Sequence, residues 1–390
     1  MPDCIDYHDY CDSDMVKRII FFAVTSLAMV VMIWFGLSTD VGIRRNPLPG
    51  SEFPRARVLD IFDGGQQTLL VEILSGAHRG KTAEVRNIVF VDAVVNPQIG
   101  QTIIIHFDYH GNGNYSAHVH SYVRDTAIYI IVALFLGLIA LAGGKAGLRS
   151  AYGLIFSFVA LLFLLIPAIM RGGPPAFLTI LVALLITTVS LIAIMGFEKK
   201  TWVSIAGTVV GIAFYCLFYV IIAAALRITG ANIPEMNQLV VLGFTETANL
   251  TELLFCGILI ASLGAVTDTT VSVASATEEI SKTGMGFNEL FKSSMRMARD
   301  CIGSSANTLI LAFTGTFFIT LIMFQLHELN YTMLINRVDI AIEVLRAISA
   351  SAGMILCAPA TALLGSFFCK DCSKNNKISS RENEERKHVK

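Results

Sequence analysis

Residues 19–37 read IIFFAVTSLAMVVMIWFGL, and this run of 19 residues without a charge decides the class of fold. A helix rises about 1.5 Å per residue, so the run can cross a hydrocarbon layer about 30 Å thick. Lys17 and Arg18 precede the run. A cleaved signal peptide, the alternative interpretation, would have a shorter apolar core and a small-residue cleavage site. We therefore interpret residues 19–37 as a first transmembrane anchor that is not removed.

The composition of the whole chain agrees with a membrane protein. Of its 390 residues 54% are hydrophobic and only 15% are charged, whereas soluble domains carry about 25% charged residues. The net charge of −1 shows no excess of basic residues for binding phosphates, so we expect no nucleic acid partner. No cysteine lies between Ser38 and Arg124, which argues against a disulfide framework in that segment.

Seven more apolar runs follow the first and predict an all-α membrane bundle of about eight transmembrane helices. The runs cover Ile128–Ala142, Ala151–Met170, Pro175–Met195, Trp202–Leu226, Leu250–Thr267, Asn307–Leu326 and Ile340–Phe368. Pro167 and Pro359 lie inside two of them and predict a kink or a helix end there, because proline has no N–H to donate. Residues 126–368 would form a seven-helix membrane domain.

The basic residues of the loops predict the orientation of the bundle. Every second loop and the C-terminal tail carry most of the Lys and Arg, including Lys145, Arg149, Lys199, Lys200, Lys282, Lys292, Arg296 and Arg299. The positive-inside rule then places both termini in the cytoplasm, which requires an even number of spans. Residues 1–18 and 369–390 would be cytoplasmic tails, and their acidic and Lys/Glu/Asn-rich compositions predict disorder.

Residues 53–123 fall between the first two spans and alternate like strands, so we expect a β-rich domain outside the cytoplasm. The expected strands are Ala56–Phe62, Thr68–Leu74, Lys81–Val89, Thr102–Tyr109 and Tyr115–Val123. Glycine-containing segments between them supply turns. Five short strands in such a segment predict a small closed barrel of the OB-like kind.

The last two strands carry a cluster of histidines. If the apolar residues of both strands face one core, the alternate residues share the other face. These residues are His106, Asp108, His110, His118 and His120. They are candidate ligands of a divalent transition metal, and the simpler interpretation is a set of polar residues on a wet sheet face. A pH response through the histidines is a third interpretation.

The sixth span predicts the functional site. Its uninterrupted apolar part, Leu253–Val266, would be only about 21 Å long, so Glu252 or Asp268 must lie near or inside the hydrocarbon boundary. The stub Leu239–Phe244 precedes it, separated by the polar stretch TETANLTE. Short, interrupted apolar segments are typical of transport sites.

The residues after the sixth span, AVTDTTVSVASATEEI, would place several polar side chains on one helix face. We consider Asp268, Thr269, Ser272, Ser275 and Glu279 candidates for a substrate or ion path. The simpler interpretation is an ordinary helix end whose acids meet cytosolic water.

The seventh and eighth spans add further polar candidates. Residues 287–302 predict an amphipathic helix on the inner leaflet. Arg299, Asp300 and Asn307 then lead into the seventh span, and we expect Arg299 to form a structural ion pair with Asp268 or Asp300. Glu343 and Arg346 are three residues apart in the eighth span and form either an interfacial salt bridge or a second polar element of the path.

Two further patterns carry less specific information. Gly207-x-x-x-Gly211 in the fifth span, and Gly257, Ala261 and Gly264 in the sixth, predict close helix packing. No phosphate loop, nucleophile motif or zinc-protease motif is present, so we expect no enzymatic activity and no cofactor.

Three blocks of the chain resemble a known family. They are GILIASLGAVTDTTVSVASATEEI (257–280), ARDCIGSSANTLILAF (298–313) and AIEVLRAISASAGMILCAPATALL (341–364). In this order they resemble the YibE/F-like family of bacterial membrane proteins, and RARVLDI and GKTAEVRNI of the β-rich segment are similar to it as well. The resemblance implies a bacterial inner membrane protein and leaves its activity open.

By this resemblance, several residues of the chain correspond to polar positions of the family. These are Asp268, Ser272, Glu279, Arg299, Asp300, Asn307, Glu343 and Arg346. The sequence departs from the family pattern at Glu252, Thr269 and Ala298. A site that depends on Glu252 would therefore be peculiar to this chain.

From these features the leading hypothesis is a permease or secondary transporter for an unknown small solute or ion. The alternative is a non-transporting membrane scaffold or envelope factor, whose β-rich domain binds a peptide, a glycan or a protein partner. Beside the lipid bilayer, expected partners are the solute and a second copy of the chain or a family paralogue.

Overall fold

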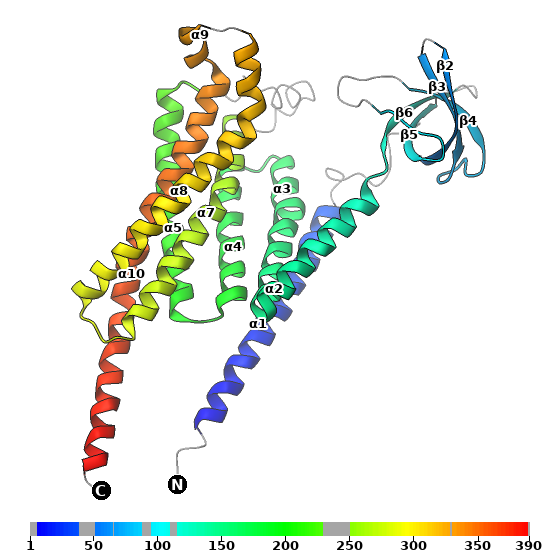
Figure 1. Cartoon of the computed structure of the whole chain (residues 1–390). Coiled ribbons are helices and arrows are strands. Elements are labelled where there is room, and N and C mark those ends of the chain that lie inside the picture. The colour runs from blue at the N-terminus through cyan, green and yellow to red at the C-terminus, as the bar shows by residue number, and fades with distance from the viewer. Residues whose placement is uncertain are drawn as a thin grey trace. The chain divides into compact units, whose positions relative to one another are not determined.

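The computed structural model describes residues 6–38, 51–64, 66–87, 95–109, 115–228, 250–327 and 330–388. The chain divides into two compact units, Ile43–Gly144 on one side and Met1–Gly42 with Lys145–Lys390 on the other. The first unit holds the strands, and the chain as a whole is mostly helical (Figure 1).

The strands of the first unit close into a small barrel. They are β1 (Ser51–Glu52), β2 (Arg55–Gly64), β3 (Gln66–Ile73), β4 (Thr82–Arg86), β5 (Thr102–Tyr109) and β6 (Tyr115–Tyr122). β2, β3 and β4 pair as an antiparallel meander, and β5 pairs with both β2 and β6. A parallel pair at Arg86 and His118 joins β4 to β6, so the five longer strands form a closed ring.

The barrel confirms the small β-barrel that the sequence predicted. Alternation places one face of each strand inside, and fully buried residues such as Val58, Leu69, Val85 and Ile103 form its core. β5 has the predicted bounds, and β2, β3 and β6 end within two residues of theirs. The predicted end of the third strand at Val89 lies outside the described residues.

The described helices are α1 (Asp6–Leu37), α2 (Asp125–Val159), the π-helix η1 (Ala160–Leu165), α3 (Ile166–Met170), α4 (Pro175–Met195), α5 (Lys199–Ala225), α7 (Leu250–Ser281), α8 (Phe287–Leu326), α9 (Tyr331–Ile335) and α10 (Val338–His388). Of these, α4 has the bounds of its predicted span, and most of the other long helices extend beyond theirs. Among the described residues, seven helical stretches are long and apolar enough to cross a membrane. α8 merges the predicted interfacial helix and the seventh span into one element.

One of the seven stretches, Asp125–Met170, contains both the second and the third predicted span. Its 46 residues would reach about 69 Å as a straight helix, about twice the thickness of the hydrocarbon layer. The helix is broken only at Gly144, whose φ of 53° is left-handed and favours glycine. Two spans in this stretch, and eight in all, therefore stay a prediction.

The two prolines inside the predicted spans behave differently. Pro167 follows η1, and a π-helical turn there accommodates the backbone carbonyls that proline cannot pair with. α10 instead continues through Pro359, so the helix does not end there, and the predicted alternative of a kink stays a prediction.

Both termini depart from the predicted disorder. α1 begins at Asp6 and α10 continues to His388, so helices cover most of both predicted tails. Adding residues to an existing helix needs no new nucleation, which is the costly step of helix formation. A composition typical of disorder therefore missed helices that the adjoining spans extend.

Small residues let α5, α7 and α10 approach closely. A Cβ at Gly211 of α5 would lie 2.6 Å from Val266 Cγ1 of α7 and 3.0 Å from Cys357 Cβ of α10. A Cβ at Gly353 of α10 would lie 2.9 Å from the backbone oxygen of Gly211. The predicted close packing is thus confirmed at Gly211, whereas it is wrong at Gly257 and Gly264 of α7, where an added Cβ would meet nothing within 4 Å among the described residues.

Candidate functional site

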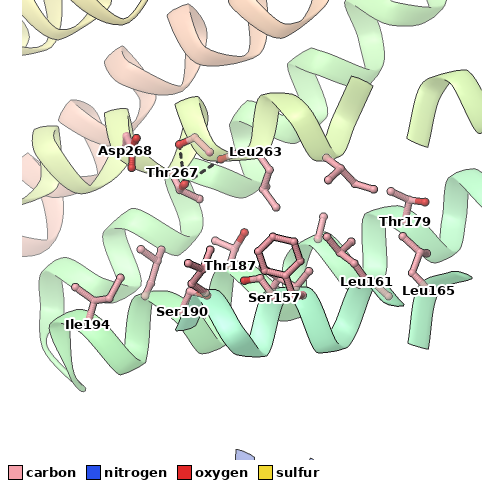
Figure 2. A pocket seen from close by; sticks show the side chains of 18 of the residues that line it. Ser157, Leu161, Leu165, Thr179, Thr187, Ser190, Ile194, Leu263, Thr267 and Asp268 are labelled. Atoms are coloured by element: carbon pink, nitrogen blue, oxygen red, sulfur yellow. Dashed lines mark hydrogen bonds between the residues drawn. The ribbon is translucent and has the colours of Figure 1, made fainter. Parts of the chain in front are cut away.

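A cavity of about 410 Å³ lies inside the helical unit, between α2 with η1, α4 and α7 (Figure 2). Aliphatic side chains make up most of its wall. The polar side chains that line it are Ser157, Thr179, Thr187, Ser190, Thr267 and Asp268. In Figure 2, Asp268 and Thr267 of α7 lie toward one end of the cavity, near Ile194 and Ser190 of α4. Thr179 and Leu165 lie at the other end of the cavity.

Asp268 is the only charged residue among the described residues that line the cavity. Its carboxylate is accessible, and no hydrogen bond or ion pair joins it to another residue in the part of the chain that the structure describes. The side chain therefore keeps its full capacity to accept hydrogen bonds or to pair with a cation.

Polar contacts of Glu252 and Glu278, near the two ends of α7, provide reference points for the depth of Asp268 in a membrane. Near one end, the Lys200 ammonium lies 3.1 Å from Glu278 of α7 and 2.5 Å from Glu198. Near the other end, the backbone N–H of Ala176 donates to Glu252 over 3.4 Å. Asp268 is 16 positions from Glu252 and 10 from Glu278 on one helix, or about 24 Å and about 15 Å.

These distances place Asp268 at membrane depth if the helices span a bilayer. Glu252 and Glu278 are about 39 Å apart along α7, so a layer about 30 Å thick centred between them ends about 4 to 5 Å inside each acid. Asp268 would then lie about 10 Å inside the nearer boundary. A carboxylate at this depth needs protein or water around it, and the cavity supplies both a wall and space.

The hydroxyls of the cavity wall differ in what they bind. Thr179 donates to Pro175 O over 2.8 Å, and Thr267 donates to backbone carbonyls of its own helix over 2.9 and 2.8 Å. Thr187 is 2% exposed, and its Oγ1 has no hydrogen-bond partner among the described residues. Leaving a buried hydroxyl unpaired costs about 1–3 kcal/mol, and Oγ1 of Thr187 is closed off from the cavity by its neighbours.

Sequence reasoning missed the cavity face of α4. Thr187 and Ser190 lie, with Thr188, in a run that is otherwise apolar, where a few hydroxyls carry no obvious signal. Their spacing from Thr179 and from Ile194 keeps the four residues near one face of the helix. A search for hydroxyls that recur at helical spacing within the fourth span would have found this face.

The other path candidates on α7 do not line the cavity. Thr269 is fully buried and donates to Ala265 O over 2.9 Å. Ser272 is exposed and Ser275 is half-buried. Glu279 is exposed and pairs with Lys282 over 2.6 Å. Of the predicted polar face, only Asp268 therefore lines the cavity. The predicted apolar stub Leu239–Phe244 lies outside the described residues.

The candidates on α8 lie apart from the cavity. Arg299, Asp300 and Asn307 are all exposed. The expected ion pair of Arg299 with Asp268 or Asp300 is not formed among the described residues. The wall of the cavity contains no α8 residue in the part of the chain that the structure describes.

The candidates on α10 form a pair of their own. Arg346 Nη1 donates to Glu343 Oε2 over 3.2 Å, and the Glu343 side chain is only 15% exposed. The other carboxylate oxygen, Oε1, is buried without a partner among the described residues. Asp339 pairs instead with Arg337, over 2.7 Å. Glu343 and Arg346 are therefore a mostly buried ion pair that does not reach the cavity around Asp268.

The histidines gather on one face of β5 and β6, as their register requires. His106 is paired directly with His118, and its Nδ1 lies 3.0 Å from Nε2 of His118. His106 Nε2 lies 3.2 Å from Asp108, and the Phe53 ring stacks on His106 at 4.4 Å between centroids. A bulge after Ile104 shifts the register near His120.

The metal hypothesis for this face gains no support from the described geometry. Among the described residues no three His, Cys, Asp or Glu side chains converge closely enough to hold a metal ion. His110 lies outside the described residues, so the full set of five stays a prediction. What the structure describes is a hydrogen-bonded imidazole pair flanked by a carboxylate and an aromatic ring.

This histidine pair predicts that acid weakens the barrel. Burial, and next the neighbouring His106, hold the pKa of His118 below its ordinary value of 6.5. The unfolded chain takes up the proton first, so the free energy of unfolding is unaffected above about pH 6.5 and falls below it until the folded pKa is passed. We expect hydrogen exchange of residues 115–122, corrected for intrinsic rates, to accelerate between neutral pH and about pH 5.

The control for this experiment is His118→Gln, which removes the titrating group and keeps a polar side chain. We expect exchange in the variant to lose most of the acid-dependent acceleration. Equal acceleration in both proteins would contradict the assignment to His118.

Comparison with known proteins adds one finding. The sequence model described as YibE/F-like protein matches residues 131–371, which include α4, α5, α7, α8 and every residue of the cavity wall. No curated protein and no solved structure matches the chain. The matched range leaves the barrel strands outside it.

Proposed function

The chain belongs to the YibE/F-like family, and from this premise we propose that it is a permease or secondary transporter of the bacterial cell membrane. Its several long apolar helices support a multi-pass membrane protein. In our proposal both termini are cytoplasmic, the helices form eight spans, and the barrel is extracytoplasmic.

The observation that carries the proposal is an acid without a partner in a mostly aliphatic cavity. An Asp at the centre of a membrane helix costs about 2.5–3.5 kcal/mol on insertion scales. An acid of purely structural use is normally paired, whereas no partner of Asp268 is found among the described residues. Binding of a proton or of a cationic group would compensate this cost, which is a functional reason to keep the acid.

The helices around the cavity suggest how access would alternate. α4 and the α2–η1 segment form two walls, and α7 carries Asp268 and Gly264 on the third. η1 is a π-helical turn, an element that recurs at functional sites because it packs less regularly than an α-helix. Small shifts of α7 against α4 would open the cavity toward one end or the other. Asp268 would remain on the cavity wall in both states.

Thiol labelling tests this function before any substrate is known. We expect Ser190→Cys, on the cavity wall, to react with a membrane-impermeant cationic methanethiosulfonate in both right-side-out and inverted vesicles. Leu217→Cys, exposed on α5 and outside the cavity, is the matched control and should stay unlabelled in both. Fragmentation of the labelled peptide in the mass spectrometer assigns the label to a single residue, which is needed because native Cys216 adjoins position 217.

Labelling of Ser190→Cys from neither side would contradict the transport function, because a conduit must meet water. Labelling from one side only would favour the second candidate, an envelope factor whose helices serve as an anchor. The observation behind that candidate is the face of the barrel where Phe53, 47% exposed, stacks beside His106 and His120. Exposed aromatic and imidazole rings are suited to bind a peptide or a glycan.

A further inference from the structure

The charge of the cavity limits what it can hold. Asp268 is its one charged group, and no Lys, Arg or His is among the described lining residues. Anions would be repelled by this carboxylate, and the low polarity of the wall strengthens the repulsion. A ligand with two positive charges would leave one of them without a partner in an apolar site.

The wall also argues against an inorganic cation. Ca²⁺ binds six to eight oxygens, and Mg²⁺ needs near-octahedral geometry. Among the wall hydroxyls, Figure 2 shows Thr267 and Ser190 near the end that holds Asp268, whereas Thr179 lies at the other end. Asp268 thus has too few oxygens around it to replace a hydration shell.

The shape and the wall of the cavity favour an organic body. Its volume of about 410 Å³ lies within the range of about 300–1,000 Å³ that is usual for small-molecule sites. Thr179 and Ile194, near its two ends on α4, are 15 positions apart, or about 22 Å along the helix.

We propose that this cavity binds an organic monocation with an apolar body, whose positive group pairs with Asp268 and whose body lies against the aliphatic side chains of α4, α7 and η1. The inference rests on the proposed transport function and names the class of its substrate. The proposal also explains why Asp268 lies among aliphatic residues without a basic partner, because the positive charge of the ligand would neutralise its carboxylate.

Tetraphenylphosphonium and tetraphenylborate provide a direct test, because they have nearly the same size and shape and opposite charges. We would measure binding of each radiolabelled ion to the full chain in lipid nanodiscs, with empty nanodiscs subtracted to remove partition into lipid. We expect saturable binding of tetraphenylphosphonium and none of tetraphenylborate.

The variant Asp268→Asn keeps the size of the side chain and removes its charge. We expect it to bind tetraphenylphosphonium at least tenfold more weakly. The matched control is Asp300→Asn, an exposed acid outside the cavity, for which we expect unchanged binding. Thermal unfolding of each variant shows whether it remains folded, and Asp268→Glu, which restores the charge, should recover part of the binding.

Three results would overturn the proposal: no saturable binding of tetraphenylphosphonium, equal binding of tetraphenylborate, or unchanged binding by the folded Asp268→Asn protein. Each is separable from failure of the transport function. If Ser190→Cys is labelled from both sides and the cation does not bind, the conduit stands and the substrate class is wrong. If the cation binds through Asp268 and labelling occurs from one side only, the site binds without transporting.

Discussion

Gly264→Phe should reduce labelling of a cysteine at position 190 by at least tenfold, from both sides of the membrane. Gly264 lies on the cavity wall, and a Cβ built there would meet nothing within 4 Å. The backbone therefore leaves room for a side chain to start here, and we expect the phenylalanine ring to occupy the space between α7 and α4. The measurement compares labelling rates of Ser190→Cys with and without the second substitution.

Gly257→Phe is the matched control for this substitution. Gly257 lies seven positions earlier on α7, its Cβ would also meet nothing within 4 Å, and it does not line the cavity. We expect labelling at position 190 to be unchanged in this variant and the unfolding midpoints of both phenylalanine variants to stay close to that of the parent. Unimpeded labelling in Gly264→Phe would mean that the reagent reaches Ser190 by a route other than the cavity.

Gly211→Ala should destabilise the helical unit by about 1–3 kcal/mol, the usual cost of overpacking a tight core. The added methyl group would lie 2.6 Å from Val266 Cγ1 and 3.0 Å from Cys357 Cβ, and the backbone oxygen of Gly353 is 3.3 Å away. The backbone oxygen cannot rotate aside, so α5 and α10 must separate. The measurement is the midpoint of thermal or denaturant unfolding of the full chain in detergent.

Gly257→Ala makes the same chemical change in open space and serves as the control. We expect no loss of stability there, and a small gain is consistent with the higher helix propensity of alanine. Equal midpoints for Gly211→Ala and Gly257→Ala would show that α5 and α10 do not approach as closely as the structure has them.

The barrel was predictable because strand patterns are local. Alternation of apolar residues gave β5 its bounds and placed Ile103, Ile105 and Phe107 in the core, where all three are buried. The same alternation predicted that His106 and His118 share one face of the sheet, and the structure pairs them directly. Helix ends were harder, because hydropathy reports the part of a helix that meets lipid and not the turns that extend beyond it. α7 continues for 14 residues past Thr267, through a polar sequence that no apolar run could reveal.

The candidate site was predictable only in part. The short apolar stretch of the sixth span identified Asp268, because depth in a membrane follows from the length of a helix. Which polar neighbours share its cavity depends on how α4 and η1 pack against α7, and no single-helix pattern contains that information. Ser272 and Glu279 share a helix face with Asp268 by their spacing but do not line the cavity, whereas Ser190 is far away in the sequence and lines the same cavity.

The environment of the Asp268 carboxylate in a bilayer tests the account most directly. An electron cryomicroscopy map of the full chain in lipid nanodiscs, sharp enough to show ordered water, would locate it. We expect the carboxylate between α4 and α7, within the depth of the acyl chains, with density for water or a bound molecule beside it. A carboxylate in bulk water beyond the headgroups, with the space between these helices closed by side chains, would contradict the account.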